Sequence, residues 1–249
     1  MIVEFYMNKI LSKIKKKIEK GDWYRISFLG DSITSTEWVH PNWREIVEYV
    51  LKDKLEEMLG SYEVPYWKIR CYNDGFNGAS TRELISFVDE EIGKHNSDLI
   101  IFLDTYNDKY YDISFDKHRE NLQIIFDKLK EKSSELLFSS SISSLTEECN
   151  KKDLAYVLSA EELIKETRDI KYIDLFSEYS KFDLNRFFTF ISENNPVAGA
   201  KEGDIDPSHP NQLGNAYIAK VLLKEIFGIE FDPELYIKET LEGKKYPAY

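Results

Sequence analysis

The strongest constraint on the fold is a run of five apolar residues, Leu-Ile-Ile-Phe-Leu, at positions 99–103. A strand without polar alternation has both faces covered, as strands of parallel sheets between helices do. Apolar residues at helical spacing mark segments 43–59, 81–92, 115–130, 160–167 and 211–227, and β-rich runs mark 25–29, 67–72, 135–140 and 172–175. This alternation predicts an α/β fold, a three-layer α/β/α sandwich whose five-stranded parallel sheet has the 99–103 strand at its centre.

Both ends of the chain fall outside this alternation. Residues 1–22 carry six lysines, and Ile10, Ile14 and Ile18 repeat at every fourth position, which places them on one face of a helix. We expect this basic amphipathic helix to dock that face on the main domain, and contact with an anionic membrane surface is the alternative. The main domain is then residues 23–230, and residues 231–249 form an extension packed on it.

Residues 181–203 also break the alternation. They contain Phe182, Phe187, Phe188 and Phe190, followed by Asn194, Asn195 and Pro196. The composition leaves two interpretations open, a packed connection and a mobile flap over a site.

Composition narrows the class of protein. Apolar residues make up 42% of the 249-residue chain, enough for a sizeable core, and the formal charge of −12 argues against nucleic acid as a partner. No apolar run approaches the length of about 18 residues that spans a bilayer. The two cysteines, Cys71 and Cys149, are too few and too far apart for a disulfide framework. We expect a cytoplasmic protein with reduced thiols.

Polar and small residues follow four of the predicted strands. Ser32 follows the first, Gly75 and Gly78 follow the second, Asn107 follows the third, and Asp206 with His209 come after the fifth. In an open parallel sheet the carboxyl ends of the strands meet at one edge, where helix N-termini also direct free N–H groups. We therefore expect these side chains to gather at one site.

The gathered residues supply what acyl transfer needs. A serine hydroxyl requires a base, and the base requires a third group to orient it, so we assign Ser32 as nucleophile, His209 as base and Asp206 as its partner. The oxyanion would be bound by the N–H groups of Ser32 and Gly78 and the side-chain amide of Asn107. Taken singly, each motif is more often a turn or a helix cap, and only their joint occurrence favours catalysis.

At these positions the sequence resembles the SGNH/GDSL hydrolases, a family of serine esterases that includes GDSL-like lipases and acylhydrolases. The first block of the family looks like residues 28–34, around Gly30-Asp31-Ser32, and its Asn-x-Gly-x-x-Gly block matches residues 73–78. The Asp-x-x-His block matches residues 206–209, followed by Pro210 and Asn211. The third block is usually Gly-x-Asn-Asp, and here Thr105 replaces the glycine.

The resemblance covers residues 25–227 and implies a flavodoxin-like sandwich, an acyl-enzyme on Ser32, and no metal or other cofactor. It does not fix the substrate, because members act on acetylated sugars, lysophospholipids, thioesters and simple esters. We expect removal of small acyl groups, such as acetyl, from a carbohydrate or related small molecule. The alternatives are a lysophospholipase or thioesterase, favoured if residues 181–203 cover a long groove, and a catalytically silent binding module.

Further residues near the site have two interpretations each. We expect the substrate to contact Asp31, Trp38 and Tyr106. The aromatic residues near the site could also stack on a sugar ring, although aromatic side chains more commonly pack in a core. These aromatics are Trp38, Trp43, Tyr106, Tyr110 and Tyr111. Asp104, Asp108 and Asp112 recur every four residues, but the expected strand end and turn disfavour a cation site there. His40, His95 and His118 lack zinc-ligand spacing, and we expect them at the surface.

Overall fold

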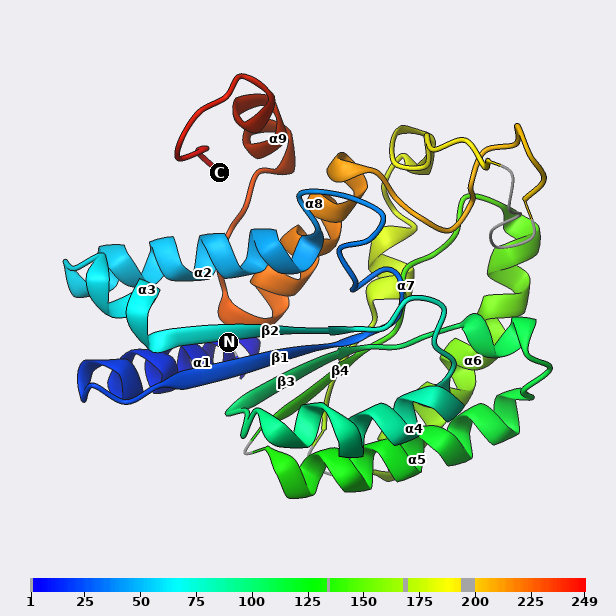
Figure 1. The fold of residues 1–249 in the computed structure, drawn as a ribbon, viewed down its shortest axis with the longest axis horizontal. Helices are drawn as coiled ribbons and strands as arrows, with labels where there is room; N and C mark the ends of the chain where they lie inside the picture. Colours follow the sequence, from blue (N-terminus) through cyan, green and yellow to red (C-terminus); the bar gives the residue numbers. More distant parts are fainter. Residues whose placement is uncertain (1, 134, 168–169, 194–199) are drawn as a thin grey trace.

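The computed structural model describes residues 2–133, 135–167, 170–193 and 200–249. A sheet of five parallel strands lies at its centre, in the order β2-β1-β3-β4-β5 (Figure 1). The strands are β1 (Tyr24–Gly30), β2 (Ile69–Gly75), β3 (Leu99–Leu103), β4 (Leu136–Ser139) and β5 (Lys171–Ile173). This is the flavodoxin-like order, with the predicted central strand in the middle.

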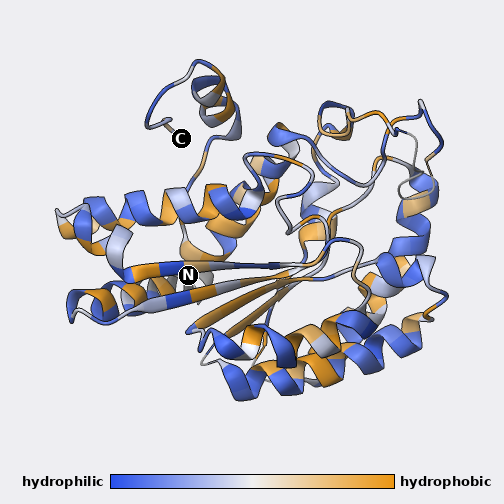
Figure 2. Ribbon diagram, viewed as in Figure 1, coloured by the Kyte–Doolittle hydropathy of each residue, from blue (hydrophilic) through white to orange (hydrophobic). Residues whose placement is uncertain are grey.

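Helices cover both faces of the sheet (Figure 1). Along β3, Leu99, Ile101 and Leu103 enter one apolar core, and Ile100 and Phe102 enter the other. Figure 2 shows apolar residues gathered on the strands and on the helix sides that face them. The first core contains α1 (Ile2–Glu19), α2 (Trp43–Leu59), α7 (Leu175–Tyr179) and α8 (Gln212–Leu222), and the second contains α4 (Thr81–Glu90), α5 (Phe115–Lys132) and α6 (Glu147–Glu166). The three-layer prediction is confirmed.

Several predicted boundaries are wrong. Trp67, expected in a strand, lies in the short helix α3 (Glu63–Lys68), and β2 begins only at Ile69. Helix α6 begins at Glu147 rather than near residue 160, because the Thr146 side chain accepts from the Cys149 N–H and two glutamates occupy the first turn. The predicted last helix is divided into α8 and a π-helical turn, η4 (Leu223–Phe227). Short helical segments also follow α4, β3 and α7: η1 (Ile92–Lys94), η2 (Asn107–Tyr110) and η3 (Leu184–Arg186).

The isoleucine face of α1 is buried in the main core. Ile10, Ile14 and Ile18 are each at most 1% exposed, in the same core as η4 and β1. The apolar face of α1 thus packs on the main domain, as the docking interpretation expects. Among the described residues, none of the helices combines the length and the apolar character needed to cross a bilayer.

The C-terminal extension packs on the main domain through α9 (Pro233–Leu241). Asp232 caps the helix by accepting from two backbone N–H groups, and Pro233 occupies its first turn. Phe231 and Tyr236 are buried in the main core, and the Tyr249 hydroxyl donates to Asp53 on α2 at 2.6 Å.

Residues 181–193 form a packed connection. Phe187 and Phe188 are each 1% exposed and belong to the core that contains α8. Hydrogen bonds from Ser192 N–H to the Asp204 carbonyl and from Gly203 N–H to the Ser192 carbonyl close the segment onto the chain that leads to the site. The flap hypothesis also involved Asn194, Asn195 and Pro196, which lie outside the described residues.

Candidate active site

Ser32 lies in a tight turn directly after β1. The N–H groups of Thr34 and Ser35 both donate to the Asp31 carbonyl, which fixes the turn. The end of β2 abuts the turn so closely that a Cβ added at Gly75 would lie 2.3 Å from the Ser35 nitrogen. The glycine of the second block is therefore required for backbone approach, and it sets the position of the nucleophile.

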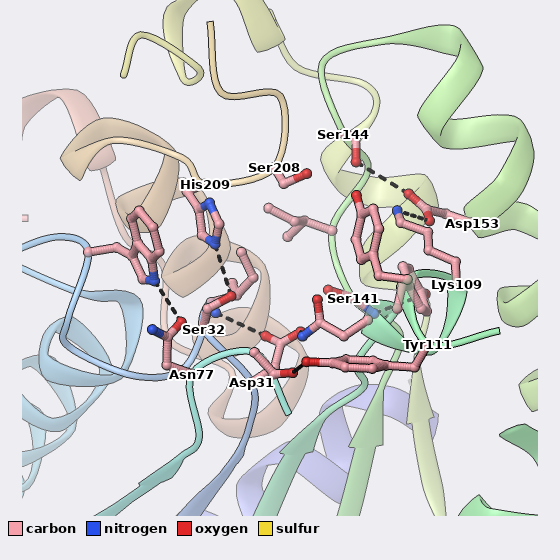
Figure 3. Close-up of a pocket in the computed structure, with 17 residues that line it drawn as sticks. Asp31, Ser32, Asn77, Lys109, Tyr111, Ser141, Ser144, Asp153, Ser208 and His209 are labelled. Carbon is pink, nitrogen blue, oxygen red and sulfur yellow. Dashed lines mark hydrogen bonds and ion pairs between the residues drawn. The ribbon is translucent and has the colours of Figure 1, made fainter. Parts of the chain in front are cut away.

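The predicted nucleophile, base and carboxylate form one chain of hydrogen bonds. The Ser32 Oγ lies 2.9 Å from the Nε2 of His209 (Figure 3). The Nδ1 of His209 lies 2.6 Å from the Oδ2 of Asp206. The other Asp206 oxygen accepts from the N–H groups of Ser208 and His209. Both carboxylate oxygens are thus engaged, so the imidazole is held in one orientation with Nε2 toward Ser32. In this geometry an imidazole can take the proton of the serine hydroxyl.

Trp38, which we expect to contact the substrate, packs on His209. Its indole ring is stacked on the imidazole of His209, with ring centroids 4.1 Å apart and planes 12° from parallel. The indole Nε1 donates to Asn77 Oδ1 at 2.9 Å, which ties the ring to the loop after β2. Trp38 still lines the cavity, but its clearest contact is with His209, which the sequence motifs did not indicate.

The three residues that carry the proposed oxyanion donors, Ser32, Gly78 and Asn107, all line one cavity. Gly78 has a φ of +72°, a backbone conformation that favours glycine. The side-chain nitrogen of Asn107 donates to Asp31 Oδ2 at 3.2 Å and to the Ala79 carbonyl at 3.0 Å. The amide of Asn107 is therefore held beside the nucleophile, and to serve an oxyanion it must share one of these hydrogens.

Asp31 is a buried carboxyl group between the nucleophile turn and Asn107. It accepts from the Ile33 N–H at 2.9 Å as well as from Asn107. Burial raises the pKa of Asp31 to about 6, although the hydrogen bonds from Ile33 and the Thr105 side chain act in the opposite direction. Its contacts are with the loops of the site, and its predicted contact with substrate stays a proposal.

Thr105, which stands where the resembling family has glycine, links two loops of the site. Its hydroxyl donates to the Ala79 carbonyl at 2.9 Å and accepts from the Asn107 N–H at 3.2 Å. The side chain is fully buried. The replacement therefore adds a connection between the loops after β2 and β3 that glycine could not make.

A buried ion network lies beneath this loop. His118 on α5 is 0% exposed, with Nδ1 2.9 Å from Asp108 Oδ2 and Nε2 3.2 Å from Asp104 Oδ2. The surface prediction for His118 was wrong, because the residue lies on the apolar side of its helix. Burial alone would lower the pKa of His118, but the charges and hydrogen bonds of the two carboxylates outweigh it and raise the pKa to about 9.

Asp104, Asp108 and Asp112, which are spaced four residues apart, do not gather around one point. Asp104 and Asp108 face His118, while Asp112 lies in a turn with a φ of +52°. Asp108 also accepts from the backbone N–H and hydroxyl of Thr81, at the start of α4. Among the described residues, no cluster of three or more His, Cys, Asp or Glu side chains is arranged to hold a metal ion.

The cavity beside Ser32 has a volume of about 320 Å³. Of the aromatics expected there, Trp43 is fully buried against Phe28, and Tyr106 is 6% exposed with its hydroxyl accepting from the Ser141 N–H. Tyr110 and Tyr111 also line the cavity and are 46% and 48% exposed, so both can meet a ligand there. The wall opposite His209 contains Lys109, Ser141, Ser144 and Asp153 (Figure 3), which the sequence motifs did not identify.

No protein-family model matches the chain, and no curated protein matches it. Solved structures resemble it in fold. A lipase/acylhydrolase from Enterococcus faecalis matches with a TM-score of 0.60 and 19% identity, over 82% of this chain and 96% of its own. The acetylxylan esterase Axe2 from Geobacillus stearothermophilus gives 0.60 and 16%, over 84% and 96%, and the acetyl xylan esterase AlAXEase gives 0.61 and 18%, over 81% and 99%.

These likenesses establish the fold of the chain. It is a three-layer sandwich around a five-stranded parallel sheet, shared with those lipase/acylhydrolase and acetyl xylan esterase structures, and it agrees with the fold that the sequence resemblance implied. The names of the similar structures describe the activities of those proteins.

Proposed function

We propose that this protein is a serine ester hydrolase that forms an acyl-enzyme on Ser32. The observation that supports this proposal most strongly is the chain of hydrogen bonds from Ser32 through His209 to Asp206. Its two contacts measure 2.9 and 2.6 Å, and Ser32 and His209 line a cavity. Ser32 Oγ attacks the acyl carbon while His209 Nε2 takes its proton, and Asp206 stabilises the imidazolium that results.

The later steps of the proposed reaction use the same groups. The N–H groups of Ser32 and Gly78, with the Asn107 amide, bind the oxyanion of the tetrahedral intermediate. When the intermediate collapses, His209 returns the proton to the leaving alkoxide, and the alcohol departs. Water then attacks the acyl-serine with His209 as base, which releases the carboxylic acid and restores Ser32. No metal or organic cofactor is needed in this scheme.

We further propose that the acyl group is small, such as acetyl, and that the alcohol is a carbohydrate or related small molecule. The limited volume of the cavity, its polar wall and the half-exposed Tyr110 and Tyr111 support this choice. Two similar structures are named acetylxylan or acetyl xylan esterase. Lysophospholipase or thioesterase activity is the alternative within the class of ester hydrolases.

We also propose that the protein is cytoplasmic, because its two cysteines are free thiols, which stay reduced in that compartment.

A fluorophosphonate probe tests whether Ser32 is a nucleophile. Wild-type protein should be labelled at Ser32, and Ser32→Ala should not be labelled although its circular dichroism is unchanged. His209→Ala should label at least 100-fold more slowly, since the serine then lacks its base. A folded wild-type protein that resists labelling would favour a catalytically silent binding module.

Acyl-chain length separates the enzymatic alternatives. Rates on 4-nitrophenyl esters from acetate to decanoate should fall steadily with chain length, because the polar side chains in the cavity wall, among them Lys109, Ser144 and Asp153, disfavour contact with a long alkyl chain. A maximum at eight carbons or more would refute the small-acyl proposal and favour a lysophospholipase or thioesterase.

A further inference from the structure

The wall of the cavity that faces His209 contains a charged pair that the proposed reaction does not use. Lys109 comes from η2 and Asp153 from α6, and their Nζ and Oδ1 atoms lie 2.5 Å apart. The lysine side chain is 12% exposed and the aspartate side chain 1% exposed. Figure 3 shows the pair across the cavity from Ser32 and His209.

The pair is held in place by its surroundings. The Ser144 hydroxyl donates to the second Asp153 oxygen at 3.3 Å. Ser144 is fixed in turn, because its N–H donates to Asn150 Oδ1 and its carbonyl accepts from Asn150 Nδ2. The Lys109 ammonium also lies 5.1 Å from the centroid of the Tyr110 ring. Three elements therefore build one rigid polar group at the cavity wall.

The chemistry of this group favours hydroxyl ligands. Charges taken out of water stabilise a fold weakly, because desolvation offsets their attraction, so a buried pair on a cavity wall invites a functional explanation. The Lys109 ammonium has three donor hydrogens, so a ligand hydroxyl in the cavity can accept from one that Asp153 does not use, while the buried Asp153 holds the ammonium in place. Because the two charges neutralise each other, the group has no net charge with which to select an anion.

We propose that Lys109 and Asp153 form the subsite for the alcohol portion of the substrate and select a neutral polyhydroxylated alcohol with a free hydroxyl near the ester. This inference rests on the proposed function for its orientation, because the acyl group must be held at Ser32. Tyr110, which lies beside Lys109 and is half-exposed, would cover the apolar face of such an alcohol.

The test compares four acetate esters at matched concentrations. They are 4-nitrophenyl acetate, methyl glucoside with one acetyl group, fully acetylated methyl glucoside, which has no free hydroxyl, and an acetylated methyl glucuronide, which carries a carboxylate. The test variant is Lys109→Met with Asp153→Leu, since replacing both members of a buried pair by apolar residues leaves no unpaired charge. The control is Lys117→Met with Glu120→Leu, which removes an exposed pair on α5.

In the wild type, kcat/KM should be at least tenfold higher for the monoacetylated than for the fully acetylated glucoside. In the test variant, the ratio of kcat/KM for the monoacetylated glucoside to that for 4-nitrophenyl acetate should fall at least tenfold, mainly through KM. The control pair should leave this ratio unchanged. An unchanged ratio in the test variant would overturn the subsite, and so would a tenfold preference for an acetylated methyl glucuronide, which would indicate selection of an anion.

Binding separates this proposal from the proposed function. Ser32→Ala protein, which cannot form an acyl-enzyme, should bind monoacetylated methyl glucoside in calorimetry, and adding the Lys109 and Asp153 substitutions should weaken binding at least tenfold. If the wild type hydrolyses no ester but this binding persists, the hydrolase proposal fails and the subsite stands. If the wild type hydrolyses aryl acetate and no such binding is measured, the subsite fails alone.

Discussion

Replacement of His118 by leucine tests whether the buried ion network supports the site. His118 lies between Asp104, at the end of β3, and Asp108, on the turn that carries Asn107. Leucine preserves the apolar volume on α5 but leaves both carboxylates buried without their cation. The side chains of all three residues are 0% exposed, so water cannot take the place of the imidazolium without rearrangement.

The expected cost is large. Breaking a buried ion pair by removing one partner typically lowers the free energy of unfolding by about 3–5 kcal/mol. For a domain of this size, each kcal/mol lowers the melting temperature by roughly 2–4 °C, so calorimetry of His118→Leu should show a drop of roughly 6–20 °C. The control is His40→Gln, at a largely exposed histidine, which should change the melting temperature by less than about 2 °C.

The cost should also depend on pH. The pKa of His118 is raised to about 9 in the folded protein, whereas an unfolded histidine titrates near 6.5. The stabilisation is therefore fully present below about pH 6.5 and is lost as the pH rises through 9. The difference in melting temperature between wild type and His118→Leu should be largest near pH 6 and shrink by pH 9.5. A difference below 2 °C, or one that grows with pH, would refute the assignment of His118 as the cation of this network.

Three further substitutions test other parts of the structure. Asn107→Ala should lower kcat on aryl acetate on the order of 100-fold, or about 3 kcal/mol, because one oxyanion donor is lost; an unchanged kcat would remove Asn107 from that role. Trp38→Ala should lower kcat up to roughly tenfold through loss of the ring stacked on His209, and Trp38→Phe should restore part of it. Ile14→Glu should lower the melting temperature by at least about 5 °C because it buries a charge in the core, whereas Lys16→Ala, exposed on the same helix, should have little effect.

Most of the fold could be predicted because the central strand is wholly apolar and because helix-like and strand-like segments alternate along the chain. The run at 99–103 became β3 with the same bounds, and its neighbours followed from the alternation. The start of α6 at Glu147 could not be placed by apolar spacing, because its early turns are polar. Its capping threonine and two acidic residues were the available signal.

Some residues of the site could likewise be predicted from the sequence and others could not. Ser32, Asp206 and His209 were predictable, because strand-end placement and motif order together specify where they meet. The lack of zinc-ligand spacing does not show whether His118 is exposed, whereas its position four residues before Leu122 places it on the buried side of α5. Lys109 and Asp153 could not be paired from sequence, since they come from different elements and neither stands in a motif.

The Ala79 carbonyl accepts from both the Thr105 hydroxyl and the Asn107 amide. Two donors from the loop after β3 thus converge on one acceptor in the loop after β2, next to Gly78. If Asn107 turns toward a developing oxyanion, the hydroxyl of Thr105 still holds that carbonyl, so the neighbouring Gly78 N–H keeps its place while the amide moves. Threonine at position 105 would then allow the Asn107 amide to change its hydrogen-bond partner during turnover while the Thr105 hydroxyl keeps its bond to Ala79.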